Sequence, residues 1–130
     1  MNRDVISSAE APAAIGPYSQ AIRAGGFVFC SGQIPLDAES GAMVGGDDVR
    51  AQTQKVMENL RAVLVAAGSS LAGAVKMNIS LTDLADFAAV NEVYGTFFEG
   101  VAPPARACVQ VAALPRGAKV EIEAIAIVAE

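Results

Sequence analysis

The sequence predicts one α+β domain spanning residues 1–130, in which a mixed β-sheet carries two helices packed on one of its faces. Strand-like and helix-like patterns follow one another in the order strand, strand, short extended piece, helix, strand, helix, strand, strand. A chain of 130 residues can bury roughly two thirds of the surface that it exposes when unfolded. We therefore expect one hydrophobic core and one domain.

The chain begins with a predicted β-hairpin over residues 17–34. PYSQAIRA and FVFCSGQI have the character of strands, and Gly25-Gly26 between them is a strong hairpin signal. The Pro and Gly residues of 35–46 then predict a surface loop with one short extended piece.

A first helix is expected to follow this loop. Residues with helical spacing on its buried side are Val49, Thr53, Val56, Leu60, Val63 and Ala67. Asp47 and Asp48 favour the positive N-terminus of the helix, and Gly68 is placed to end it. Residues 74–81 alternate as a strand.

The last part of the chain is predicted to add a second helix and a second hairpin. Asp83 is the expected N-cap of the helix, which should end near Gly100. The runs 105–112 and 118–128 alternate with a period of two residues, as strands do. Between them, residues 114–117 (LPRG) have the Pro and Gly positions of a type I turn.

This second hairpin would place unusual polar groups together on one face. If residues 114–117 close the turn, then Arg106, Cys108 and Gln110 lie opposite Ile125, Glu123 and Glu121. One face of the hairpin would be apolar, and the other would hold an arginine, a thiol and two carboxylates. Because both helices cover one face of the sheet, the second face would be exposed in a monomer, and we expect self-association.

The composition restricts the class of protein. Although 53% of the residues are apolar, no uncharged apolar run reaches the 18 residues of a membrane span. The start of the chain contains Asp4 and Glu10 and lacks the apolar core of a secretory signal, so a cytoplasmic protein is expected. Cys30 and Cys108 are too few for a disulfide framework and lack metal spacing, so we expect two free thiols.

The chain contains no histidine, which removes the commonest general base and a common zinc ligand. It also lacks both glycine-rich nucleotide motifs. A net charge of −5 without a basic cluster argues against nucleic-acid binding. Any catalysis must therefore use carboxylates, Arg, Tyr, Ser, thiol, backbone and water, and we expect no metal and no cofactor.

Arg106 is the first candidate site residue. Its planar guanidinium suits bidentate binding of a carboxylate, and its small neighbours Ala105 and Ala107 leave it accessible. An ion pair with Glu123 explains Arg106 equally well from the sequence alone.

The other candidates each have two interpretations. Glu121 near an apolar interface would have a raised pKa and could move a proton, or it is a solvated edge residue. Tyr18 follows a rigid Gly-Pro pair and is either a site residue or an interface aromatic. Ser31 and Gly32 offer a hydroxyl and backbone N–H groups to an anion, or they end a strand. Asn91 belongs to a cleft rim or to a helix surface.

Several motifs carry a family resemblance. They are IGPYSQAI at 15–22, SGQIP at 31–35, FAAVNEVY at 87–94, PPARACVQV at 103–111 and VEIEAIA at 120–126. With them the chain resembles, from end to end, the RidA/YjgF family of enamine and imine deaminases, once described as translation inhibitors or endoribonucleases.

The resemblance implies a homotrimer whose sheets face inward, with ligand clefts between subunits. It implies that Arg106 binds the carboxylate of a 2-imino acid and that Tyr18 lies in the cleft beside it. Glu121 and the backbone carbonyl of Cys108 would hold the attacking water. With no His or Lys partner for Cys108, thiolate chemistry is the weaker interpretation of that residue.

The implied function is cofactor-independent hydrolysis of small 2-imino acids, such as 2-iminopropanoate or 2-iminobutanoate, to 2-keto acids and ammonia. Two alternatives stay open. One is a non-catalytic, small-molecule-binding or holdase-like trimer, and the other is an endoribonuclease or translation inhibitor, against which the acidic charge and the absent histidine argue.

Overall fold

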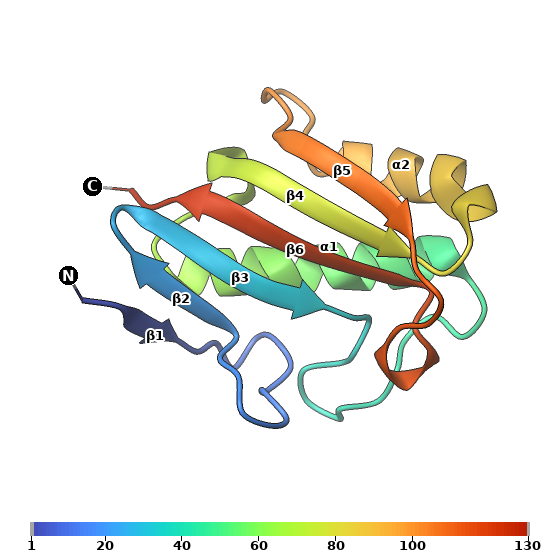
Figure 1. Ribbon diagram of the computed structural model, residues 1–130, viewed down its shortest axis with the longest axis horizontal. Coiled ribbons are helices and arrows are strands. Elements are labelled where there is room, and N and C mark those ends of the chain that lie inside the picture. The colour runs from blue at the N-terminus through green and yellow to red at the C-terminus, as the bar shows by residue number, and fades with distance from the viewer. Residues whose placement is uncertain (1, 130) are drawn as a thin grey trace.

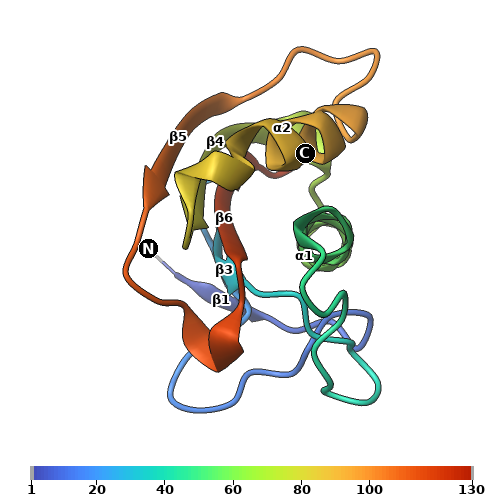
Figure 2. The same cartoon turned by 90° about the vertical axis from the view of Figure 1, so that its right-hand side faces the viewer.

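Six strands form one sheet in the order β1-β2-β3-β6-β4-β5 in the computed structural model, which describes residues 2–129 (Figure 1). The strands are β1 (Asp4–Ile6), β2 (Ala21–Ala24), β3 (Phe27–Gln33), β4 (Ala74–Leu81), β5 (Ala105–Gln110) and β6 (Val120–Ile127). Neighbouring strands are antiparallel except β4 and β5, which are parallel. Helices α1 (Val49–Ala66) and α2 (Phe87–Thr96) lie on the same face of the sheet (Figure 2). The predicted fold class, a mixed sheet with two helices on one face, is confirmed.

The first predicted hairpin is confirmed as β2 and β3. Gly25 and Gly26 form its turn with φ values of 60° and 83°. Two consecutive positive φ values match the right-handed twist of the strands, and glycine adopts them without steric cost.

Helix α1 forms the main contact between the helix layer and the sheet. Five of its apolar side chains are completely buried: Val56, Met57, Leu60, Val63 and Leu64. The helix begins as predicted, because Asp48 accepts hydrogen bonds from the backbone N–H groups of Arg50 (2.9 Å) and Ala51 (3.3 Å). Gly68 follows its end with a φ of 81°, as the predicted stop requires.

Helix α2 is shorter than predicted at both ends. Asp83 caps a separate 3₁₀ turn, Leu84–Asp86, through a hydrogen bond from the backbone N–H of Ala85 (2.9 Å). At the other end, the N–H of Phe97 bonds to the carbonyl three residues before it (3.1 Å). This tighter 3₁₀ pattern ends the α-helix before Gly100.

The predicted hairpin of residues 105–112 and 118–128 is wrong. β4 lies between β5 and β6, parallel to the first and antiparallel to the second (Figure 1). The reason is that α2 carries the chain from β4 to β5 as a crossover, which makes these two strands parallel neighbours. The turn also differs from the predicted type I, since Arg116 takes φ 61° and ψ 18°.

The observed register places Arg106 and Glu121 on opposite faces of the sheet, so the single polar face predicted from the hairpin is also wrong. Met77 of β4 is aligned with both Arg106 and Ala124, and it is fully buried under the helices. Ser80 is aligned with Glu121, and odd and even residues of a strand point to opposite faces. Arg106 therefore lies on the helix side and Glu121 on the other.

Two short extended pieces were harder to predict. β1 pairs with β2 at one edge of the sheet, where no strand was predicted. The extended piece predicted within 35–46 is present only as one isolated bridge between Leu36 and Met43.

The sheet face away from the helices, called the bare face below, carries an apolar patch. Its large apolar residues are Val5, Ile22, Phe27, Phe29, Ile125 and Ile127. Phe29 is 45% exposed and Ile127 is 50% exposed. The predicted uncovered face is confirmed, and a patch of this kind is typical of an interaction surface. Within residues 2–129, neither helix is long and apolar enough to cross a membrane.

The first prediction concerns the start of α1. Asp48→Ala is expected to lower the free energy of unfolding by about 1 kcal/mol, because two backbone N–H groups lose their acceptor. Urea denaturation followed by circular dichroism measures this change. Asp47→Ala is the matched control, since its exposed side chain precedes the cap, and a change below about 0.5 kcal/mol is expected for it. Equal losses in the two variants would contradict the cap.

Candidate functional site

The seven predicted site residues form two groups. Four of them line one pocket of about 610 Å³: Tyr18, Ser31, Gly32 and Glu121. The other three lie on the edge strand β5 and on α2: Arg106, Cys108 and Asn91. One copy of the chain does not bring the two groups together.

A β-bulge shapes the wall of the pocket. Between the aligned pairs Cys30–Ala124 and Gln33–Ile122, β3 has two residues, Ser31 and Gly32, where β6 has one. Such a bulge bends the strand and redirects its side chains.

Both donors of Ser31 are used inside the fold. Its hydroxyl donates to the carbonyl of Ser19 (2.6 Å), and its N–H donates to the carbonyl of Gln20 (2.9 Å). Only the oxygen lone pairs of the hydroxyl remain for a ligand. The predicted donation from Ser31 to an anion therefore has no free donor in this arrangement.

Gly32 has no side chain because Glu121 occupies the space. A Cβ atom at position 32 would lie 2.7 Å from Cδ of Glu121 and 3.1 Å from its Oε2. The glycine therefore lets the carboxyl group rest directly on the bulged strand.

The environment of Glu121 changes its acidity. Partial burial, followed by the charge of Glu123, raises the pKa of Glu121 above its ordinary value. Glu123 itself accepts a hydrogen bond from Asn78 Nδ2 (3.0 Å). A carboxyl group with a raised pKa is better suited to exchange protons near neutral pH than an ordinary surface glutamate.

Tyr18 lies in the wall of the pocket, and its side chain is 52% exposed. Its hydroxyl lies near the backbone N–H of Ile15 (3.4 Å).

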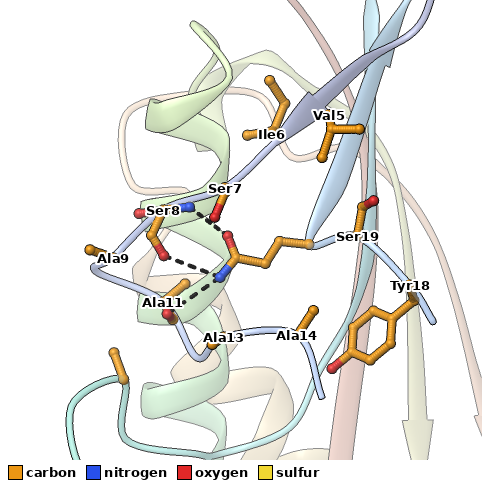
Figure 3. A pocket seen from close by; sticks show the side chains of 12 residues that line it. Val5, Ile6, Ser7, Ser8, Ala9, Ala11, Ala13, Ala14, Tyr18 and Ser19 are labelled. Atoms are coloured by element: carbon orange, nitrogen blue, oxygen red, sulfur yellow. Dashed lines mark hydrogen bonds between the residues drawn. The ribbon is translucent and has the colours of Figure 1, made fainter. Parts of the chain in front are cut away.

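The loop that carries Tyr18 and Ile15 is held by Gln20, a buried residue that the sequence reasoning missed. Its Nε2 donates to the carbonyls of Pro12 (2.7 Å) and Ser8 (3.1 Å), and its Oε1 accepts from the N–H of Ser8 (2.6 Å). A second pocket, of about 610 Å³, lies beside this amide (Figure 3). The sequence signal for this role of Gln20 was a polar glutamine within the strand-like run PYSQAIRA.

Arg106 is held against α2. Its Nη1 donates to Oδ1 of Asn91 (2.5 Å). Its guanidinium carbon lies 5.4 Å from the ring centre of Phe87 and 5.2 Å from that of Tyr94, within the range of cation–π attraction. The alternative ion pair with Glu123 is wrong, because the two side chains are on opposite faces. Arg106 is exposed, and its other N–H groups stay available to a ligand.

Burial favours the protonated form of both thiols. Burial raises the pKa of Cys30 to about 12. Burial also raises the pKa of Cys108, and the charge of Arg106 opposes this only in part. Both cysteines are free, as predicted, and neither environment favours a thiolate.

Comparison with known proteins extends over nearly the whole chain. The sequence model of the family described as endoribonuclease L-PSP matches residues 8–128. Protein DfrA of Myxococcus xanthus is 61% identical over 129 residues, which cover 98% of this chain and 97% of that protein. The mouse 2-iminobutanoate/2-iminopropanoate deaminase is 50% identical over 125 residues, 96% of this chain and 91% of that protein. The crystal structure of Escherichia coli TdcF with bound serine superposes with a TM-score of 0.92 at 46% identity, covering 97% of this chain and 99% of that one.

The raised pKa of Glu121 predicts a pH-dependent stability. Ionising this carboxyl costs more free energy in the folded protein than in the unfolded chain. The folded state therefore loses stability as the pH rises through the raised pKa, and the penalty is absent below the ordinary value of 4.5. Glu121→Gln should raise the thermal midpoint at pH 7, and this gain should shrink toward pH 4.

Differential scanning fluorimetry at several pH values measures this gain. The matched control is Glu99→Gln, a substitution of the same kind at an exposed position away from the pocket. A gain for Glu121→Gln that is the same at pH 4 and pH 7 would contradict the prediction.

Proposed function

The chain belongs to the endoribonuclease L-PSP family, which is the RidA/YjgF family that its motifs indicated, and we propose that it hydrolyses small 2-imino acids. Water adds to the C=N carbon of R–C(=NH)–COO⁻, and loss of ammonia leaves the 2-keto acid R–CO–COO⁻. Relatives named as deaminases at 46–50% identity support a deaminase activity. The proposed substrates, 2-iminopropanoate and 2-iminobutanoate, are those in the name of the mouse relative.

The close approach of Glu121 to Gly32 is the observation that carries this proposal. The side chain is half-buried in a pocket large enough for a ligand, and burial raises its pKa. In the proposed mechanism the carboxylate orients the attacking water and accepts its proton, then returns a proton to the departing nitrogen. The backbone carbonyl of Cys108 is the second group that holds the water.

Arg106 is the proposed anchor for the carboxylate of the substrate. Asn91 fixes one Nη atom, which leaves the rest of the planar fork pre-oriented for two parallel hydrogen bonds. Because Arg106 and Glu121 lie on opposite faces of one sheet, the site must combine Arg106 of one copy with Glu121 and Tyr18 of another.

We propose a homotrimer in which the bare faces point inward. The exposed side chains of Phe29 and Ile127 support burial of this face, since an apolar patch on a sheet is costly to leave in water. Three copies would form three equivalent clefts, each with residues from two subunits.

The proposed reaction needs no cofactor. Imines of this kind hydrolyse unaided in water, so the catalyst has only to lower a modest barrier. Holding the substrate through its carboxylate and placing one water beside the C=N carbon removes much of the entropic cost of the bimolecular step.

RNA cleavage, which the family description names, has less support from the side chains. The sequence has no histidine and a net charge of −5, and the pocket that contains Glu121 also contains Glu123. These carboxylates repel a phosphodiester.

The trimer is tested by light scattering, which should give a mass of about three times 13.3 kDa. Phe29→Asp should weaken the assembly, because it places a charge in the centre of the apolar patch. Val65→Asp is the matched control on the outer face of α1, where the side chain is 63% exposed, and it should leave the mass unchanged. A monomeric wild-type protein would exclude the intersubunit site.

Arg106→Lys should lower imine hydrolysis at least tenfold, because a point charge cannot replace two parallel hydrogen bonds. The assay generates 2-iminopropanoate from alanine with an amino acid oxidase and measures competition with trapping by semicarbazide. Glu121→Gln should lower the rate by about 10²–10⁴ while carboxylate ligands still bind.

The matched control for this experiment is Arg61→Lys. Arg61 also lies over an aromatic ring, 5.4 Å from the centre of Phe97, but on the outer side of the helices. The Arg61→Lys variant should hydrolyse the imine as fast as the wild type does. Full activity of Arg106→Lys or of Glu121→Gln would refute the mechanism.

A further inference from the structure

Arg116 has an unusual backbone conformation. Among residues 2–129 it is the single residue other than glycine with a positive φ, at 61°. Side chains with a Cβ atom disfavour this left-handed region, and such strain is found preferentially at functional sites. Glycine or asparagine would adopt the turn between β5 and β6 more easily, so the turn itself does not explain the arginine.

The side chain of Arg116 lines the same pocket as Glu121. Among the described residues around this pocket it is the one cationic group, while Glu121 and Glu123 are anionic. None of the ion pairs within residues 2–129 includes Arg116. Arg116 is exposed, so its guanidinium remains accessible to a ligand.

The pocket of a single copy, before Arg106 of another copy is added, has more room than a three-carbon acid requires. Its volume of about 610 Å³ lies in the range of roughly 300–1,000 Å³ that is typical for drug-sized ligands. Ile15, Ile34 and Pro115 supply apolar parts of the pocket wall. This lining suits a substrate side chain with methylene groups and a polar end.

Resting on the function proposed above, we propose that Arg116 selects 2-imino acids whose side chain carries a second carboxylate. Arg106 of another copy binds the carboxylate next to the imine, and Arg116 binds the distal one. Glu121 and Glu123 repel a second anion in this pocket, and the guanidinium of Arg116 offsets that repulsion. The charge at position 116 therefore decides between dicarboxylic and monocarboxylic substrates.

The test compares two imines made in place. L-glutamate oxidase produces 2-iminoglutarate, D-amino acid oxidase acting on D-alanine produces 2-iminopropanoate, and semicarbazide trapping gives kcat/KM for each. In Arg116→Gly the ratio of the dicarboxylic to the monocarboxylic value should fall about tenfold or more, as expected for a lost hydrogen bond between charged groups. Arg116→Lys, which keeps the charge, should retain most of the wild-type ratio. Arg116→Glu should lower the ratio further than Arg116→Gly does.

Glycine tolerates a positive φ, so Arg116→Gly is expected to fold with an unchanged or higher thermal midpoint. An unchanged ratio in this variant would overturn the proposal. Equal loss of both activities would also overturn it, because Arg116 would then act on a group that the two substrates share.

Binding of the products provides a readout that does not depend on turnover. Isothermal titration with 2-oxoglutarate and with pyruvate should show a selective loss of 2-oxoglutarate affinity in Arg116→Gly. The wild type could hydrolyse neither imine while Arg116→Gly still loses 2-oxoglutarate affinity selectively. In that case the proposed reaction fails, and the role of Arg116 in anion selection stands. If 2-oxoglutarate binds the wild type and Arg116→Gly equally well, the role of Arg116 fails.

Discussion

The alternation of side chains along β6 is the constraint on which the rest of the structure depends. Four of its residues are at most 3% exposed and face the helices: Val120, Ile122, Ala124 and Ala126. The intervening positions must then face the bare side. A shift of one residue would bury the carboxyls of Glu121 and Glu123 in an apolar core, at a cost of several kcal/mol each. Packing against α1 therefore also determines where the carboxylates lie.

Local signals predicted the local parts of the fold. Gly25-Gly26 and the Asp48 cap act on their own neighbours in sequence, so the first hairpin and the start of α1 could be predicted. The partner of β5 depends on where a whole helix crosses the sheet, and alternation alone does not contain that information. The face of Arg106 was predicted wrongly for this reason. The backbone of Arg116 could not be foreseen either, since arginine has no preference for the left-handed region.

The distribution of charge explains how one polar site can be divided between two surfaces. Arg106 is supported by the aromatic rings and the amide of α2, and Glu121 is supported by a glycine in a bulged strand. Within one copy neither group neutralises the other, so each stays available for a ligand. Arg116 adds a second cation on the carboxylate side, where the net charge would otherwise repel acidic substrates.

The central position of β6 has a consequence for the making of the protein. β6 is the last strand in the chain, yet it pairs with both β3 and β4 (Figure 1). While β6 is still inside the ribosome, the apolar strands β3 and β4 have unpaired edges, and α1 lacks its main surface. The sheet therefore closes only after β6 has emerged, and until then the nascent chain is in a state prone to association with other chains. A chain terminated after β5 would contain five of the six strands and still lack the one that joins them.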